Sequence, residues 1–187
     1  FIEPAGDDPL MQWDITRPFN APDDKMVDGI EVAVQHFFGE SGFGFGANAT
    51  FVDGDVKFDV EDITKVDSVA DLEPQTPLTG LSDSANFQLF YEKEGLSVKV
   101  TYAWRDEYLI GVGQAQGSSD APPQFAKEFG QVDMSINYDI DENFTVFVEG
   151  LNLNNETEQS FGRYEEQFLS ARQYGTRYTV GVRYSFK

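Results

Sequence analysis

The sequence predicts an all-β fold, an antiparallel transmembrane β-barrel. Three observations support this prediction. Segments of about ten residues alternate between large apolar and small or polar side chains, which is typical of tilted strands that cross a hydrocarbon layer. Short turns and long connections follow one another in regular order. Aromatic residues lie at both ends of the apolar stripes, as in the two aromatic girdles of a membrane barrel.

The first predicted hairpin joins residues 27–38 to residues 42–53. "VDGIEVAVQHFF" places Ile30, Val32 and Val34 on one face, opposite Glu31 and Gln35. After the tight turn "GES", "GFGFGANATFVD" continues the alternation, with Phe43, Phe45, Ala47, Ala49 and Phe51 on the apolar side. The glycines of "GFGFG" lie inside a strand, which favours a bend in the wall or a close approach of another segment.

Two further hairpins and a closing strand repeat this pattern. "ANFQLFYE" turns through "KEG" into "LSVKVTYAWR", and "QVDMSINYDI" turns through "DEN" into "FTVFVEGLNL". The last strand, Thr176–Phe186, alternates as well and ends the chain on large aromatic residues. We therefore expect seven full strands whose apolar faces meet lipid. The polar faces would line a lumen with Glu31, Gln35, Asn48, Thr50, Gln88, Lys99, Arg105, Asp133, Asn137, Glu149, Arg177 and Arg183.

The connections predict the orientation of the wall. The turns near 39–42, 92–95 and 139–143 are short and would face the periplasm. The connections near 54–81, 106–128 and 154–174 are long, and we assign no strands to them. Together with the Pro- and Asp-rich residues 1–26 they would form outer loops, and "WDITRPF" could extend a strand above the membrane.

Composition narrows the function classes. A formal net charge of −20 makes nucleic acid a poor partner, because phosphate would be repelled. No cysteine is present, so disulfides and thiolate metal sites are excluded. His36 is the only histidine and is expected at the membrane interface. No nucleophile or acid–base set stands out, so we do not expect an enzyme.

The order of short phrases resembles the C-terminal barrel region of TonB-dependent outer-membrane receptors. The phrases are "ITRPFNAPDDKMVDGIEVAVQHFF", "LTGLSDSANFQLFYEKEGLSVKVTYAWRDEYL", "PPQFAKEFGQVDMSINYDIDENFTVFVEGLNLNNE" and "YGTRYTVGVRYSF". The resemblance implies that residues 1–187 are the C-terminal portion of one barrel domain, with about seven to eight of 22 strands. Two features depart from the family: its N-terminal plug is absent from these residues, and Lys187 follows the terminal Phe186.

The resemblance also implies a function. The whole protein would import a scarce nutrient across the bacterial outer membrane, with partners that include outer-membrane lipid, the plug and remaining strands, and a TonB-type energy-coupling complex. A neutral oligosaccharide is the favoured ligand, because the acidic outer loops argue against a strongly anionic iron chelate, and a siderophore or other small molecule is the second choice. Two other classes remain open: a passive porin or adhesin barrel, and a soluble β-sandwich binding module.

Ligand contacts are expected at the outer ends of the strands and in the loops. Aromatic rings there could stack on sugar faces, and arginine could bind carboxylates in a bidentate manner. Trp104 could instead anchor the lipid interface. The candidate ligand-binding residues are Trp13, Trp104, Arg105, Tyr108, Arg163, Tyr164 and Arg172.

The acidic segment that begins at residue 53 is a weak candidate for calcium. Hard cations take clustered carboxylates, and Asp53, Asp55 and Asp59 are closely spaced. The full twelve-residue calcium-loop pattern is missing, so a solvated outer loop is the alternative. We expect no other cofactor.

Overall fold

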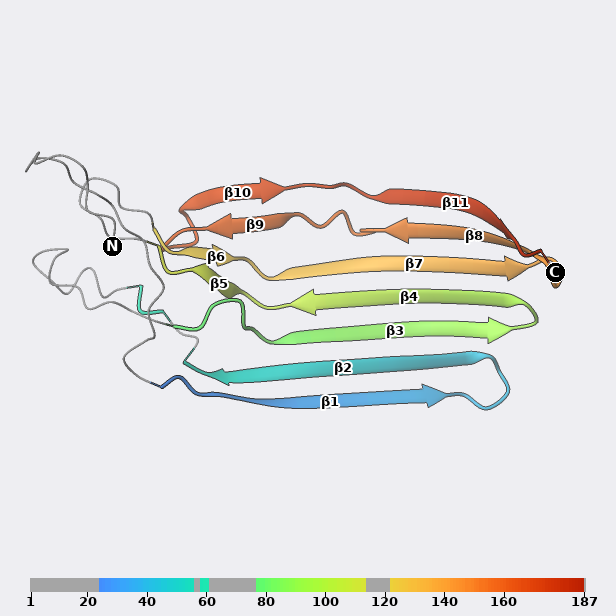
Figure 1. The fold of residues 1–187 in the computed structure, drawn as a ribbon, viewed down its shortest axis with the longest axis horizontal. Coiled ribbons are helices and arrows are strands. Elements are labelled where there is room, and N and C mark those ends of the chain that lie inside the picture. Colours follow the sequence, from blue (N-terminus) through green and yellow to red (C-terminus); the bar gives the residue numbers. More distant parts are fainter. Residues whose placement is uncertain (1–23, 56–57, 61–76, 114–121, 187) are drawn as a thin grey trace, which may run out of the picture.

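The computed structural model describes residues 24–55, 58–60, 77–113 and 122–186, and within them it contains two antiparallel sheets (Figure 1). The larger sheet has seven strands in the order β1-β2-β3-β4-β7-β8-β11. Their bounds are β1 Val27–Phe37, β2 Phe43–Gly54, β3 Ser84–Lys93, β4 Leu96–Arg105, β7 Phe129–Asp139, β8 Phe144–Leu151 and β11 Arg177–Tyr184. These are the seven strands that the alternation predicts.

The pairing register brings the apolar residues of neighbouring strands onto one face. One row across β1, β2, β3, β4 and β7 contains Val34, Ala47, Phe87, Tyr102 and Val132. The next row contains Gln35, Gly46, Gln88, Thr101 and Asp133. Because successive residues of a strand point to opposite faces, most apolar residues fall on one face and most polar residues on the other, although Phe90, Phe129 and Phe147 lie on the polar face.

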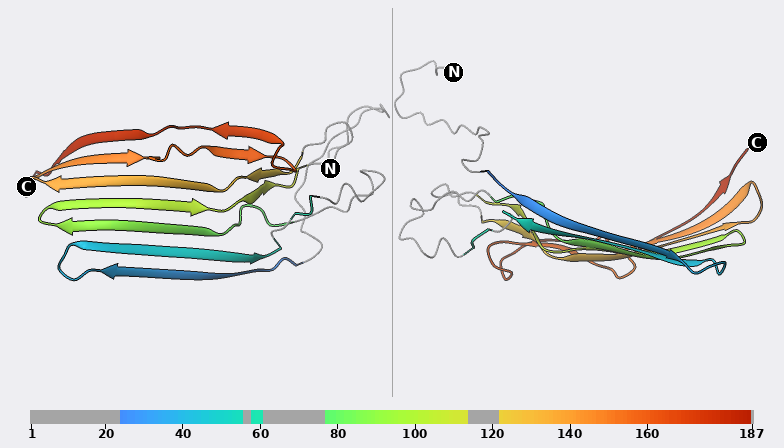
Figure 2. Two further views of the ribbon diagram at one scale, coloured as in Figure 1. Left: turned by 180° about the vertical axis from the view of Figure 1, so that it is seen from behind. Right: turned by 90° about the horizontal axis from the view of Figure 1, so that it is seen from below.

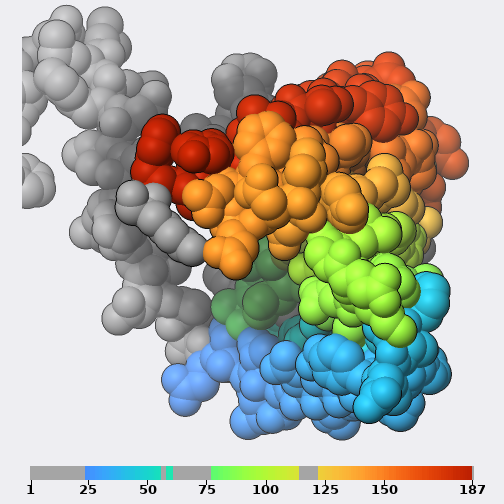
Figure 3. Space-filling model, turned by 90° about the vertical axis from the view of Figure 1, so that its right-hand side faces the viewer, coloured from blue at the N-terminus to red at the C-terminus, as the bar shows by residue number. Residues whose placement is uncertain are grey.

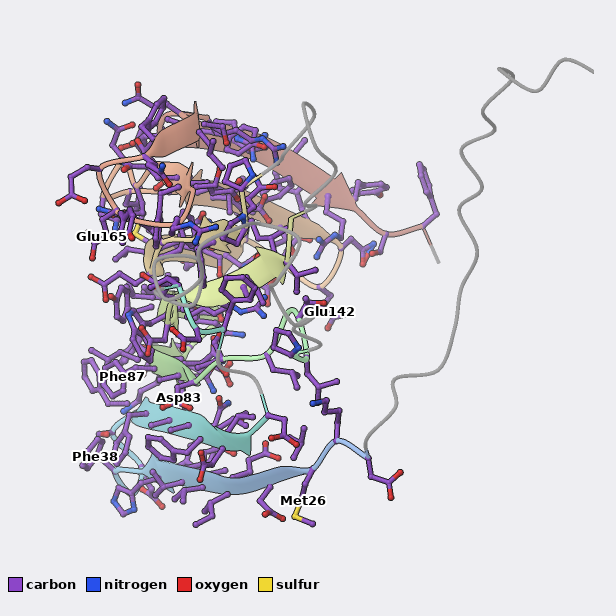
Figure 4. The ribbon with its side chains drawn as sticks, turned by 90° about the vertical axis from the view of Figure 1, so that its left-hand side faces the viewer. Met26, Phe38, Asp83, Phe87, Glu142 and Glu165 are labelled. Carbon is purple, nitrogen blue, oxygen red and sulfur yellow. The ribbon has the colours of Figure 1, made fainter. Side chains whose placement is uncertain are left out.

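The large sheet is curved (Figure 2). Viewed from the turn end, its strands follow an arc from β1 to β11 (Figure 3). Phe87, a member of the apolar rows, projects from the outer side of this arc (Figure 4). The described strands therefore form a wall with an apolar outer face and a polar inner face, as predicted for a barrel segment.

The two edge strands of the wall lack a partner on one side within the described residues. β1 pairs with β2, and β11 pairs with β8. Val180 and Val182 of β11 are 76% and 64% exposed. The sheet is thus open at β11, as the sequence predicts for a wall that further strands would complete.

All three tight turns of the large sheet lie at one end, together with the C-terminus, and the described parts of the long connections lie at the other (Figure 1). Two of these long connections differ from the prediction. They contain β5 Tyr108–Gly111, β6 Gln124–Ala126, β9 Glu158–Phe161 and β10 Phe168–Arg172, which pair in the order β10-β9-β6-β5.

The prediction that residues 106–128 and 154–174 hold no strands was therefore wrong. β5, β6, β9 and β10 have three to five residues each, which is too short for a period of two to be recognised. Their pairing is also long-range, because Phe125 of β6 lies opposite Phe161 of β9. The closing strand is shorter than predicted, since Arg177–Tyr184 replaces Thr176–Phe186.

One glycine of the inner face makes room for a neighbouring ring. Gly181 of β11 lies directly opposite Phe147 of β8. A Cβ atom at Gly181 would lie 2.4 Å from Cζ of Phe147, so the ring covers the space that a side chain would fill. No helix among the described residues is long and apolar enough to cross a membrane.

Candidate functional site

A hollow of about 320 Å³ lies where the small sheet meets β4 and β7, at the strand ends opposite to the tight turns. These are the outer ends of the strands in the predicted orientation. Arg105 and Phe129, which pair in the last row of the inner face, both line it. The hollow therefore opens at the outer end of the polar face of the wall. Its remaining lining comes from β5, β6, β9 and β10 and from Lys127, which directly follows β6. The strand residues are chiefly Tyr108, Gln124, Glu158, Ser160, Ser170 and Arg172.

The register of the small sheet arranges this lining in rows. Tyr108 pairs with Ala126, Ala126 with Ser160, and Ser160 with Ser170. Since neighbouring strands lie about 4.8 Å apart, the row spans about 14 Å from Tyr108 to Ser170. Arg172 shares the face of Ser170, two residues along β10, and lies opposite Glu158 in the register.

Arg105 is held in place by the segment that precedes β3. Its Nε donates to Oγ of Ser82 at 3.0 Å, and its Nη2 donates to the carbonyl oxygen of Gly80. Its guanidinium also lies 3.8 Å from the centre of the Tyr108 ring, a cation–π distance. Arg105 and Tyr108 therefore form one stacked unit at one end of the hollow.

A small hydrogen-bonded group forms the middle of the hollow. Ser160 is 5% exposed, and its Oγ lies 2.7 Å from Oγ of Ser170. Nε2 of Gln124 donates to the same Oγ of Ser160 at 3.2 Å. The group fixes three side chains that can hydrogen-bond to hydroxyl groups of a ligand.

The opposite face of the small sheet is a local apolar core. Leu109 and Phe161 are 4% and 5% exposed, and Pro123 is the largest fully buried side chain of the described residues. Phe125 stacks on Phe161 with a centroid distance of 5.3 Å and an interplanar angle of 16°. Phe58 makes an edge contact with Phe125 at 6.4 Å. This core gives the hollow a rigid support.

The junction between the two sheets is built by the asparagines that follow β8. Asn152 is 5% exposed and has a positive φ of 56°, which ends the strand. Its backbone N–H donates to Oδ1 of Asp133, and its side chain exchanges two hydrogen bonds with the backbone of Glu156. These contacts turn the chain from β8 toward β9.

The side chain of Asn154 hydrogen-bonds to the first residues of β7, which have no pairing partner in β8. Its Nδ2 donates to the carbonyl oxygen of Gly130 at 2.6 Å, and its Oδ1 accepts from the N–H of Val132 at 3.0 Å. A side-chain amide can mimic a backbone peptide in this way because it offers one donor and one acceptor side. Sequence reasoning missed these roles, although "GLNLNNE" is rich in the residues that accept a left-handed backbone.

The predicted ligand residues divide into separate groups. Arg105, Tyr108 and Arg172 line the same hollow. Trp104 lies in the apolar row with Ala85 and Gly130, on the face opposite to Arg105. Trp13 lies outside the described residues.

Arg163 and Tyr164 lie in the turn between β9 and β10, away from the lining of the hollow. Nη1 of Arg163 donates to the carbonyl oxygen of Val60 at 3.0 Å, and its N–H donates to Oε1 of Gln167. Tyr164 is 43% exposed. Arg163 therefore joins two connections to each other.

The calcium candidates do not form a cluster among the described residues, in which no group of three acidic or histidine side chains is arranged to hold a metal ion. Asp53 lies opposite Asp28 at the outer end of the first hairpin. Oδ2 of Asp55 accepts a hydrogen bond from the N–H of Met26 at 3.0 Å. Asp59 lies in the short described stretch 58–60, and much of the acidic segment lies outside the described residues.

Several acidic side chains lie near Lys127 at the rim of the hollow. Nζ of Lys127 forms an ion pair of 3.3 Å with Glu165, which lies in the turn between β9 and β10. The pKa of Glu107 is raised above 4.5, first by burial and then by the nearby charges of Glu165 and Asp106, while Lys127 opposes the shift. The rim thus carries more negative charge than its one lysine balances.

Comparison with known proteins gave one family. The family model described as "TonB dependent receptor-like, beta-barrel" matches residues 1–153. No curated protein and no solved structure matches the chain.

Proposed function

We propose that the chain, which belongs to the TonB-dependent receptor β-barrel family, forms part of the wall and of the ligand-contacting surface of a transporter that imports an oligosaccharide. Members of this family serve transport across the bacterial outer membrane. Upstream strands and a plug would complete the barrel, and a TonB-type complex would supply energy. The family match supports the transport part of this proposal, because it covers 153 of 187 residues.

The wall supports the membrane part of the proposal. Its outer rows contain Val, Ala, Leu and aromatic residues, and large side chains such as Leu89 and Val180 are more than half exposed. Exposed apolar rows of this extent need a cover, and hydrocarbon fits strands of this length. The inner rows carry amide, hydroxyl and charged groups that suit a wet lumen.

The hollow supports the ligand part. Tyr108 offers a ring, while Gln124, Ser160 and Ser170 offer hydrogen-bonding groups at fixed positions. An aromatic ring beside a row of hydroxyl and amide groups suits a sugar, which has apolar ring faces and many hydroxyls.

The test is uptake in the native bacterium. Cells that carry the intact receptor should accumulate a labelled oligosaccharide, and cells that lack either the receptor or the TonB-type complex should not. Uptake that continues after the energy-coupling complex is removed would favour a passive porin and contradict the proposal.

A further inference from the structure

The hollow at the outer end of the wall gathers positive charge in a strongly acidic chain. Arg105, Lys127 and Arg172 all line it, although the sequence contains only 13 Lys and Arg against 33 Asp and Glu. Glu158 also lines the hollow and Glu165 balances Lys127, so the two arginines are the groups that can receive negative charge from a ligand.

Two of the three cations are already engaged. Arg105 donates to Gly80 and Ser82 and stacks on Tyr108. Lys127 is paired with Glu165 at 3.3 Å. Both therefore have partners that hold them in position.

Arg172 differs from the other two cations. Its side chain makes no hydrogen bond or ion pair with any residue that the structure describes, and although Glu158 lies opposite it in the register, the two side chains are not ion-paired. Its planar guanidinium therefore keeps the fork of donors that matches a carboxylate. The acceptor it lacks can come from a ligand.

The neighbours of Arg172 indicate the rest of that ligand. Ser170 lies two residues away on the same face of β10, and Ser160 lies beside it. Tyr108 ends the row that contains Ser160 and Ser170, about 14 Å from Ser170. A short chain of sugar rings spans this distance, whereas a single small ion does not. The hollow thus combines one unpaired guanidinium with a row suited to hydroxyl groups and a ring.

From this arrangement, and resting on the proposed function, we propose that the hollow binds an acidic oligosaccharide and that Arg172 receives the carboxylate of a uronic acid unit. Ser160 and Ser170 hydrogen-bond to the hydroxyls of that unit, and the Tyr108–Arg105 stack supports a neighbouring ring. A neutral oligosaccharide would leave the guanidinium without an acceptor. A compact polyanion would meet Glu158 and the acidic surface.

The experiment uses the intact receptor in detergent and a panel of uronic-acid-containing trisaccharides, each beside its neutral counterpart. Calorimetric titration gives the dissociation constant of each pair. The acidic member of at least one pair should bind about tenfold or more tightly than its neutral counterpart, as expected for a charge-assisted contact. Arg172→Gln should abolish that preference, and Arg172→Lys should restore only part of it, because lysine lacks the fork.

The matched control is Arg177→Gln, which removes the same charge at the start of β11, outside the hollow. It should keep the preference for the acid. Equal binding of acidic and neutral members, a preference that survives in Arg172→Gln, or no acidic member bound would each overturn the proposal. Energy-dependent uptake of a neutral oligosaccharide would then still support the proposed function, so the two failures can be told apart.

Discussion

Val100 gives the most quantitative test of the lipid-facing surface. It is the fifth residue of the ten-residue strand β4, and it lies between Leu89 and Met134 in the outer rows. At about 3.3 Å per residue and a tilt of about 40°, it lies roughly 10 to 13 Å from each end of the strand, measured along the membrane normal. This places Val100 near the middle of an apolar band about 25 Å tall.

Val100→Arg should therefore lower the free energy of unfolding by about 2 to 4 kcal/mol, because a guanidinium at the midplane of the bilayer loses its water. The assay is urea titration of the intact receptor in lipid vesicles, followed by tryptophan fluorescence and by the gel shift of the folded barrel. The fraction of folded protein in outer membranes is a second readout.

Thr101→Arg is the matched control. Thr101 is the next residue of β4 and faces inward between Gln88 and Asp133. A charge there stays wet, so its effect should be about 0.5 kcal/mol or less. Equal costs for the two substitutions, or a larger cost at Thr101, would refute the assignment of faces.

Three further predictions concern the packing of the wall, the junction and the rim. Gly181→Ala should cost about 1 to 3 kcal/mol of unfolding free energy by overlap with the Phe147 ring, and a double-mutant cycle with Phe147→Ala should show that the cost disappears when the ring is removed. Asn154→Ala should cost about 1 to 2 kcal/mol in the same measurement through two lost hydrogen bonds to β7. The raised pKa of Glu107 means that its carboxyl group holds a proton more tightly in the folded state than in the unfolded state. Ionisation of this group therefore lowers the free energy of unfolding as pH rises above 4.5. In urea titrations, the Glu107→Gln protein should be more stable than the native protein at neutral pH and equally stable at pH below 4.5.

The seven wall strands could be predicted because each has eight to twelve residues and a strict period of two. Val98, Val100 and Tyr102 share a face in any regular strand, and the register then extends that face across the sheet. The openness of the sheet at β11 also followed from the sequence, because the alternating segments are too few to close a barrel of the expected size.

The small sheet could not be predicted. Its strands are short, and Phe125 and Phe161 pair across more than thirty residues, so their register depends on tertiary contacts. For the same reason, the sequence identified Arg105, Tyr108 and Arg172 as candidates but could not show that they share one hollow. Nor could it show that Arg105 is held by Gly80 and Ser82 while Arg172 is not.

The most direct test of the membrane wall is a scan of spin labels along β4 of the intact receptor in lipid vesicles. Labels at residues 98 to 104 are compared for collision with oxygen, which concentrates in lipid, and with a water-soluble nickel chelate. Labels that replace Val98, Val100, Tyr102 and Trp104 should be exposed to oxygen, and those that replace Lys99, Thr101 and Ala103 should be shielded from it. Uniform exposure, or an alternation of the opposite phase, would contradict the membrane wall.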